Sequence, residues 1–348
     1  MKIRLLDEID RKLVHALAID ARASFRTLGE ACGCSDQTAA RRYRRLQEEA
    51  ELRVRGDVEA LRVGWDDWLL RLQCTPAGTM PVAEALSRRA DTRWIQLASG
   101  GTEVVCVLQA RTAEQRDALL LKGLPGSRQV VQVAAHLLLE TYSDEDWRGL
   151  ASALTPAEAA RLDPPDVDAS GAPLVLDELD EALLARLSED GRASHSQIAA
   201  AIHTHESTVR RRVEELRRAG ALVFEIDLDT ATLGINSHAY LWLSVAPSEL
   251  DQVGRALATH PEVAYAAATT GRTNLFASLA FRDSHHMFEY INTSLAALPA
   301  IQSVETAPSI RTLKRTGLTH PLHPTRPRTG SSAATVRTGS HPVAGSRG

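Results

Sequence analysis

The fold of this chain is decided by two stretches of sequence that each occur twice. Leu6-Asp7-Glu8-Ile9-Asp10 returns as Leu176-Asp177-Glu178-Leu179-Asp180, and Ala21-Arg22-Ala23-Ser24 returns as Gly191-Arg192-Ala193-Ser194. Both pairs are offset by 170 residues, and the same offset relates five further identities, at Thr38, Arg41, Arg42, Leu46 and Leu52. A fixed offset held without a gap over about fifty residues indicates a duplicated structural unit.

Each copy predicts three helices. In the first copy, the first helix is marked by apolar residues at helical spacing, Leu6, Ile9, Leu13 and Leu17. Ser24 and Ser35 are placed to N-cap two further helices, with a tight turn at 32–35 between them. Two short helices joined by such a turn form a helix-turn-helix, whose second helix enters the major groove of DNA. The β-prone stretches 52–56 and 222–226 that follow are predicted to be wings.

The outward face of each third helix carries the candidate contacts to double-stranded DNA. Gln and Arg pair bidentately with adenine and guanine edges. The candidates are Ser35, Gln37, Thr38, Arg41, Arg42, Arg44, Ser207, Thr208, Arg210, Arg211 and Arg212. An arginine-rich face can also be a solvated surface, but here it follows a helix-turn-helix pattern twice. Arg42 and Arg212 lie beside the buried stripe, so they either bind phosphate or pair with a first-helix acid such as Asp10 or Asp180.

The two copies differ within this helix-turn-helix. The second has Glu214 and Glu215 where the first has Arg44 and Arg45. We therefore expect the first copy to carry more of the contact to phosphate. In the turn, His203 replaces Gly33, although a left-handed backbone suits glycine better.

Each helix-turn-helix is followed by a segment with the order βαββαβ, which is a ferredoxin-like arrangement. In the first copy its strands and helices are predicted at 68–74, 81–90, 94–98, 104–109, 113–122 and 130–139, and in the second at 239–245, 248–259, 263–269, 274–281, 284–298 and 301–313. The fold class is therefore α+β, with two winged helix-turn-helix domains alternating with two ferredoxin-like domains. The predicted boundaries are 1–60 and 175–230 for the DNA-binding domains, 66–142 and 237–315 for the effector domains, 143–174 for a linker and 316–348 for a disordered tail.

Composition is that of an ordinary globular protein, with 44% hydrophobic and 24% charged residues. No apolar run approaches the ~20 residues that cross a bilayer, and no signal-peptide core opens the chain, so we expect a cytoplasmic protein. The four cysteines are expected to be buried free thiols, and neither their spacing nor the pair His203 and His205 predicts a metal site. The net charge of −4 argues weakly against nucleic acid, but the basic residues are mostly clustered arginines.

A helix-turn-helix that opens with Leu-Asp-x-x-Asp and leads into one βαββαβ domain resembles the Lrp/AsnC (feast/famine) transcription regulators. The resemblance covers about 5–140 and 175–315 and is carried by Leu6 to Asp10, Ala21 to Ser24, Arg41 to Leu46, their counterparts in the second half, and Leu298 to Ile301 and Arg311 to Arg315. It implies a sequence-specific regulator that forms dimers and larger homo-oligomers and responds to a small molecule, commonly an amino acid. Family members usually have one unit per chain, so two units predict an internal pseudo-dimer.

The resemblance also implies an effector site at the loop before the third strand of each effector domain, where the family usually has Gly-x-x-Asp. Here the loops supply Gly100, Gly101 and Glu103 in one copy, and Gly271, Arg272 and Asn274 in the other. If the acid receives a ligand ammonium, Asn274 weakens that pairing, and the two pockets are unequal. The alternative is that these glycines only make a tight turn.

Two other functions compete with a ligand-responsive regulator. Sirohaem decarboxylases share the two-domain plan and act as pairs of unlike copies, and Thr273-Asn274-Leu275-Phe276 resembles their strand. Such an enzyme does not need an arginine-rich recognition face, and this chain keeps one twice. An architectural DNA-compacting protein without an effector is the third possibility. No other catalytic motif is present, so we predict a non-enzymatic regulator without a cofactor.

Overall fold

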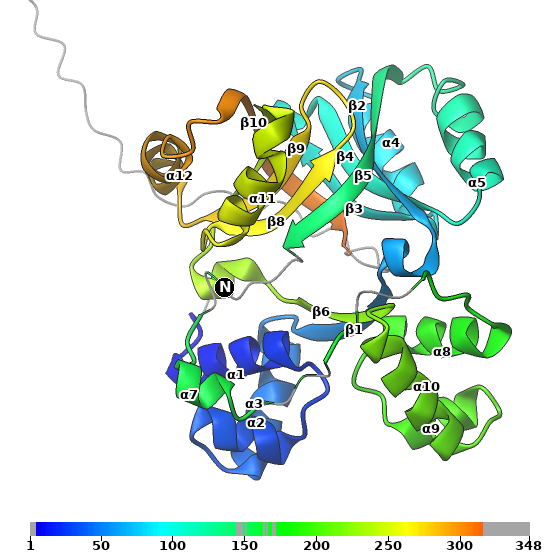
Figure 1. The fold of residues 1–348 in the computed structure, drawn as a ribbon, viewed down its shortest axis with the longest axis vertical. Coiled ribbons are helices and arrows are strands. Elements are labelled where there is room, and N and C mark those ends of the chain that lie inside the picture. The colour runs from blue at the N-terminus through cyan, green and yellow to red at the C-terminus, as the bar shows by residue number, and fades with distance from the viewer. Residues whose placement is uncertain are drawn as a thin grey trace, which may run out of the picture.

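A β-barrel lies at one end of the molecule and two helix-turn-helix units lie side by side at the other (Figure 1). The computed structural model describes residues 5–143, 149, 152–162, 164, 166–168 and 172–315. The predicted tail at 316–348 lies outside the described residues, as does part of the predicted linker at 143–174.

The two helix-turn-helix units, called here the first and second heads, are built alike. The first consists of α1 (Glu8–Ile19), α2 (Phe25–Cys32) and α3 (Asp36–Glu49), and the second of α8 (Glu178–Glu189), α9 (His195–Ala201) and α10 (Glu206–Arg218). Asp7 and Asp177 each close a capping box at the start of the first helix. The predicted apolar stripes form the two cores, with Leu13, Leu17 and Leu46 in one and Leu183, Leu187 and Leu216 in the other.

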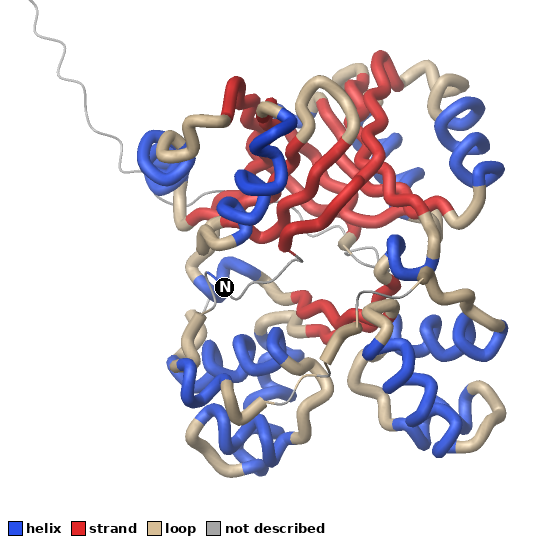
Figure 2. The backbone as a smooth tube through the Cα atoms, in the orientation of Figure 1, coloured by secondary structure: helices blue, strands red, loops and turns tan. Residues whose placement is uncertain are grey.

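The strands after the recognition helices, β1 (Arg53–Val58) and β6 (Leu222–Asp227), pair with each other in an antiparallel ribbon. The predicted wings are therefore strands, and they pair with each other across the two heads. Ile226 of β6 packs into the core of the first head, and Val58 packs against the core of the second. A Cβ at Gly56 would lie 2.8 Å from Leu187 Cβ, so the exchange brings β1 close against α8. Figure 2 shows this ribbon between the heads, below the barrel.

The βαββαβ segments together close one barrel with the strand order β10-β3-β4-β2-β5-β8-β9-β7. The first copy contributes β2 (Asp66–Cys74), α4 (Thr79–Ser87), β3 (Thr92–Ala98), β4 (Glu103–Ala110), α5 (Ala113–Asp117) with a π-helical turn (Ala118–Gly123), and β5 (Val130–Ser143). The second contributes β7 (Ser237–Val245), α11 (Leu250–Ala258), β8 (Val263–Thr269), β9 (Leu275–Phe281), α12 (Ser284–Tyr290) with a π-helical turn (Ile291–Leu295), and β10 (Ile301–Lys314). Each sheet buries one face under its own helices and turns the other toward its counterpart.

The strand pairing follows a pseudo-two-fold axis. At one seam Leu138 of β5 pairs with Thr269, and at the other Ser309 of β10 pairs with Ala98; the two pairs are related by an offset of 171 residues. In the ribbon, Arg55 pairs with Glu225, which is its own counterpart in the other copy. The pseudo-dyad therefore passes between these two residues. The chain folds as an internal pseudo-dimer, as the duplication predicts.

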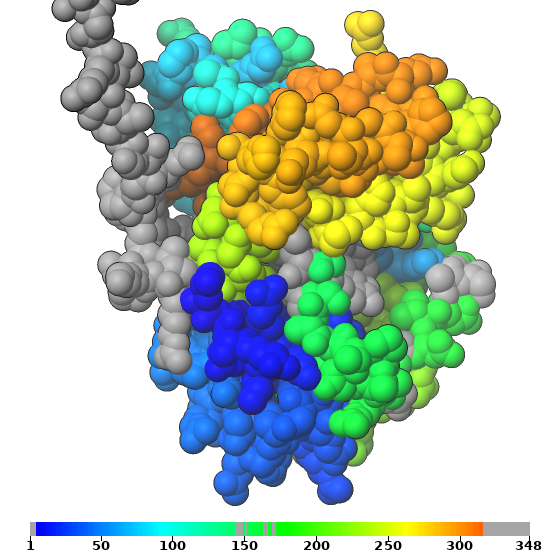
Figure 3. Space-filling view, turned by 90° about the vertical axis from the view of Figure 1, so that its left-hand side faces the viewer, coloured from blue at the N-terminus to red at the C-terminus, as the bar shows by residue number. Residues whose placement is uncertain are grey.

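Short 3-10 turns connect each head to its sheet, at Ala60–Val63 and Thr230–Leu233, and two more lie at Ser99–Gly101 and Pro247–Glu249. Within its described residues, the segment between the copies carries the helix α7 (Pro156–Ala159). It packs against the first head, where Glu158 accepts a 2.7 Å hydrogen bond from Lys12 Nζ (Figure 3). His15 Nδ1 accepts hydrogen bonds from the backbone of 153 and 154. These contacts hold residues 153–158 against the first head.

Candidate nucleic-acid interface and effector loops

The recognition helix of the first head, α3, offers two arginines to solvent. Ser35 caps it by accepting a hydrogen bond from the Thr38 backbone N–H at 3.2 Å. Arg41 and Arg44 are exposed, and within the described part of the chain neither has a hydrogen bond or ion pair. Exposed Gln37 lies one turn before Arg41, while Thr38 is half-buried. These two guanidinium groups follow a capped helix start and have no partner among the described residues. Guanidinium groups of this kind can donate hydrogen bonds to base edges and phosphates.

The recognition helix of the second head, α10, carries its arginines in ion pairs. Arg210 binds Glu206 at 3.1 Å, and Arg211 binds Glu215 at 2.8 Å. Exposed pairs of this spacing contribute only about 0.3–0.5 kcal/mol, so DNA can break them. Glu206 and Glu215, however, remain on the same helix as these arginines once the pairs are broken. Ser207 is exposed and Thr208 half-buried, as their counterparts in α3 suggest.

Arg42 and Arg212 are engaged inside their heads. Arg42 donates to Asp7 and Asp10 at 2.7 and 2.8 Å, and Arg212 donates to Asp180 at 2.5 Å. Asp10 and Asp180 are almost fully buried, so each needs a cationic partner. Of the two interpretations that the sequence leaves open, the geometry supports pairing with the first-helix acid, and these arginines are not free to contact DNA.

The turns before the recognition helices also differ. Gly33 has φ of 70° and His203, in the same place, has φ of 55°, so a histidine adopts the left-handed backbone that suits glycine. His205, the N-cap residue of α10, makes no side-chain capping hydrogen bond, whereas Ser35 caps α3. The second head therefore holds its turn and helix start at a higher conformational cost.

Two arginines, not recognised as functional from the sequence, lock the heads together. Arg22 donates to the backbone oxygens of 191 and 193, and Arg192 donates to those of 21 and 23. Both guanidinium groups also lie over aromatic rings. The Cζ atom of Arg22 is 5.8 Å from the centroid of the Phe224 ring, and that of Arg192 is 4.8 Å from the centroid of the Phe25 ring. Burial, with Arg217 and Arg192 nearby, lowers the pKa of Arg22 to about 10. The sequence holds one sign of this role, because Arg22 and Arg192 occupy the same position in the two copies of the repeat.

In the first effector loop, Glu103 is buried and used internally. It accepts hydrogen bonds from Arg71 Nε and Ser99 Oγ, both at 2.8 Å. Arg71 also binds Glu305 of the other sheet at 2.7 Å and lies 3.8 Å above the Trp242 ring. The hydrogen bond from Arg71 lowers the pKa of Glu305. Glu103 therefore serves a link between the two sheets and is not available to receive a ligand ammonium in this structure.

In the second loop, both polar atoms of the Asn274 side chain are also hydrogen-bonded within the protein. Its Oδ1 accepts from the Val245 backbone N–H and its Nδ2 donates to the Val245 oxygen, both at 2.9 Å. The replacement of Glu103 by Asn274 follows from a second difference, because Trp242 stands where the first copy has Arg71. Without an arginine at that position a buried carboxylate would lack its cation. The Glu103/Asn274 difference thus accompanies the Arg71/Trp242 difference in the packing between the sheets.

The predicted loops lie at the seams between the two sheets. Gly100 and Gly101 have positive φ of 70° and 85°, and Gly271 has φ of 116°. A Cβ on Gly271 would lie 2.5 Å from the His136 ring of β5, so this glycine permits a close approach between copies. Arg272 is exposed beside it. The glycines thus shape these turns and allow the close approach at the seam.

Comparison with known proteins places these elements in a family. The AsnC-type helix-turn-helix domain matches residues 6–47 and 176–217, and the Lrp/AsnC ligand binding domain matches residues 238–319. An uncharacterised HTH-type transcriptional regulator of Pyrococcus abyssi is 35% identical over 133 residues, which are 38% of this chain and 84% of that protein. The chain belongs to the Lrp/AsnC family. It is a DNA-binding transcription regulator with a ligand-binding domain, and it carries the family's DNA-binding unit twice.

Two further matches extend the comparison. The HTH-type transcriptional regulator FL11 of Pyrococcus horikoshii is 25% identical over 142 residues, which are 40% of this Lrp/AsnC chain and 93% of that protein. The crystal structure of the siroheme decarboxylase NirDL superimposes with a TM-score of 0.61 at 14% identity, covering 90% of this chain and 94% of that one. At this identity the likeness shows the tandem fold alone.

The remaining sequence predictions concern cysteines, metals and membranes. All four cysteines are free; Cys32, Cys74 and Cys106 are buried as expected, whereas Cys34 is only half-buried. Among the described residues, no group of His, Cys, Asp or Glu is arranged to hold a metal ion. In the same part of the chain, no helix has the length and apolar character that crossing a membrane requires.

Proposed function

We propose that this regulator reads DNA asymmetrically, with the first head as the dominant contact. The observation that carries the proposal is the pair of unengaged arginines, Arg41 and Arg44, on α3. On this view Ser35, Gln37 and Thr38 support base and phosphate contact in the first head. Ser207, Thr208, Arg210 and Arg211 make weaker contacts in the second.

The charge pattern supports the same order. Glu214 occupies the position of Arg44 and binds Arg218 at 3.6 Å, so a carboxylate stands on the DNA-facing side of α10. The other exchange, Glu215 for Arg45, lies nearer the protein, because Arg45 binds buried Asp10. A single position therefore accounts for most of the difference in charge toward DNA.

We further propose a regulatory rather than an enzymatic role. The domains are those of transcription regulators, and the cavity between the sheets is lined by four carboxylates and one arginine. A tetrapyrrole that carries many carboxylates would be repelled by such a lining. Conversion of added sirohaem by the purified protein would contradict this.

Footprinting on DNA upstream of the protein's own gene tests the asymmetry. We expect two half-sites, because the heads are tied together by Arg22 and Arg192, and protection at one half-site should persist to higher salt. Equal protection of both half-sites at every salt concentration would overturn the proposal.

A further inference from the structure

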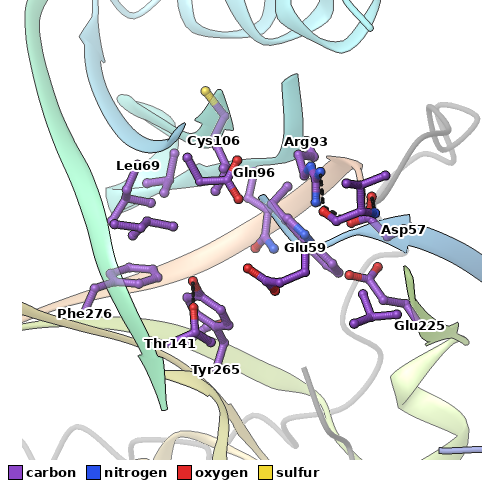
Figure 4. Close-up of a pocket in the computed structure, with 18 of the residues that line it drawn as sticks. Asp57, Glu59, Leu69, Arg93, Gln96, Cys106, Thr141, Glu225, Tyr265 and Phe276 are labelled. Carbon is purple, nitrogen blue, oxygen red and sulfur yellow. Dashed lines mark hydrogen bonds and ion pairs between the residues drawn. The ribbon is translucent and has the colours of Figure 1, made fainter. Parts of the chain in front are cut away.

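A cavity of about 180 Å³ lies on the barrel side of the β1–β6 ribbon and is lined by both copies of the repeat (Figure 4). Its walls include Leu69 and Val105 of the first sheet, Phe276 of the second, and Glu59 and Glu225 beside or in the ribbon. A cavity of about 150 Å³ is enough to hold benzene. The space is therefore large enough for a small organic molecule, and it is separate from the glycine loops.

One wall of the cavity is aromatic. Tyr240 and Phe276 have ring centroids 5.4 Å apart, and Tyr265 and Phe276 have centroids 6.2 Å apart. All three line the cavity and come from the second copy. Figure 4 shows Phe276 and Tyr265 on one side of the cavity and Arg93 with Asp57 on the other. Aromatic faces attract organic cations as well as apolar groups.

The charged lining is mostly acidic. Asp57, Glu59, Asp67 and Glu225 line the cavity, and Arg93 is the one cation among the lining residues. Arg93 is already engaged, because it binds Asp57 and donates to the Val58 oxygen at 3.4 Å. Arg55 lies opposite Glu225 in the ribbon and offsets part of its charge. The net charge of the lining side chains remains negative.

Within the described part of the chain, Asp67 has one carboxylate oxygen without a hydrogen-bond partner, although Gln109 hydrogen-bonds its side chain. That oxygen, Oδ1, is buried. Burial, offset in part by Arg93, raises its pKa to about 6. A buried carboxylate oxygen without a hydrogen bond is costly, and an incoming ammonium would supply that hydrogen bond. The second copy has His238 at this position, so the acid is specific to one side of the pseudo-dyad.

We propose that this cavity binds a small primary amine, with its ammonium at Asp67 and its apolar body against Tyr265 and Phe276. The amine must lack a free carboxylate, because the lining would repel a second negative charge and Arg93 is held by Asp57. This site concerns ligand binding alone and does not depend on which head dominates the contact with DNA.

The test is calorimetric titration of the full chain at pH 7.5 with four probes that share a phenyl body. Phenethylamine should bind at least about tenfold more tightly than 2-phenylethanol, phenylacetate or phenylalanine, since one charge-assisted hydrogen bond is worth about that factor. Equal or tighter binding of any of the other three overturns the proposal. So does the absence of heat with phenethylamine up to about 10 mM.

Three variants locate the site. Asp67→Asn should weaken phenethylamine binding at least about tenfold, whereas Glu140→Gln, which removes an exposed carboxylate on β5, should leave it unchanged. Ser278→Phe places a ring in the cavity and should abolish binding without altering its charge. Equal losses in Asp67→Asn and Glu140→Gln, or full binding by Ser278→Phe, would place the ligand elsewhere. Thermal unfolding confirms that each variant is folded before titration.

Discussion

The two heads have equivalent apolar cores and the same capping box at their first helices, yet the outer faces of their recognition helices differ. In the first, Ser35 caps α3, Gly33 takes the left-handed turn, and Arg41 and Arg44 have no partner among the described residues. In the second, His203 takes the same turn and the arginines are paired with glutamates. Duplication within one chain therefore conserves what each head needs to fold and lets the outer face of each recognition helix diverge.

The largest expected effect concerns the arginine that both heads retain. Arg212→Ala leaves Asp180 fully buried without a cation and should lower the free energy of unfolding by about 3–5 kcal/mol. Arg42→Ala should cost only about 1–3 kcal/mol, because Arg45 still binds Asp10. Urea unfolding of the two variants measures the difference. Equal losses would mean that Arg45 contributes nothing to Asp10.

A second comparison sets Asp67 against His238, its counterpart across the pseudo-dyad. The folded-state pKa of Asp67 is raised to about 6, so its burial destabilises the protein above pH 4 and does so fully above pH 6. Asp67→Asn should therefore raise the free energy of unfolding by about 1–3 kcal/mol at pH 8 and leave it unchanged near pH 4.

His238 should show the opposite dependence. Burial and Arg315 lower its pKa to about 4, so the folded state resists protonation and loses stability as the pH falls below about 6.5. His238→Gln should be less sensitive than the parent between pH 6.5 and 4, as measured by thermal unfolding. The same pH profile in both variants would contradict the assignment of these two groups.

The smallest effect concerns the turn. His203→Gly removes the cost of a left-handed histidine and should stabilise the protein by about 0.5–1 kcal/mol. Gly33→His is the matched control and should destabilise by a similar amount, since a Cβ at Gly33 meets nothing within 4 Å and only the backbone conformation is at stake. The melting temperatures of the two variants should move in opposite directions.

The local structure could be predicted from the sequence because its signals are local. Apolar spacing and cap residues placed the helices, and the order βαββαβ placed the strands close to their observed bounds. The exchange of β1 and β6 between heads could not be predicted in this way, because no periodicity says which strand pairs with which across 170 residues.

The packing of the effector loops could not be predicted for a related reason. The Glu103/Asn274 difference suggested unequal ligand pockets, but its cause is the Arg71/Trp242 difference on another strand. When two differences compensate each other in space, a single sequence does not show that the two positions are in contact. The acidic cavity was missed for the same reason, since Asp67, Arg93 and Glu225 are brought together only by the closed barrel.

Gel-shift titration on the DNA upstream of the gene tests the asymmetry of the heads most directly. Replacing Arg41 and Arg44 by alanine should weaken binding by about 100-fold, whereas replacing Arg210 and Arg211 should weaken it less than about tenfold. None of the four has a partner in a protein core, so all variants should remain folded. Equal losses, or a larger loss in the second head, would contradict the account.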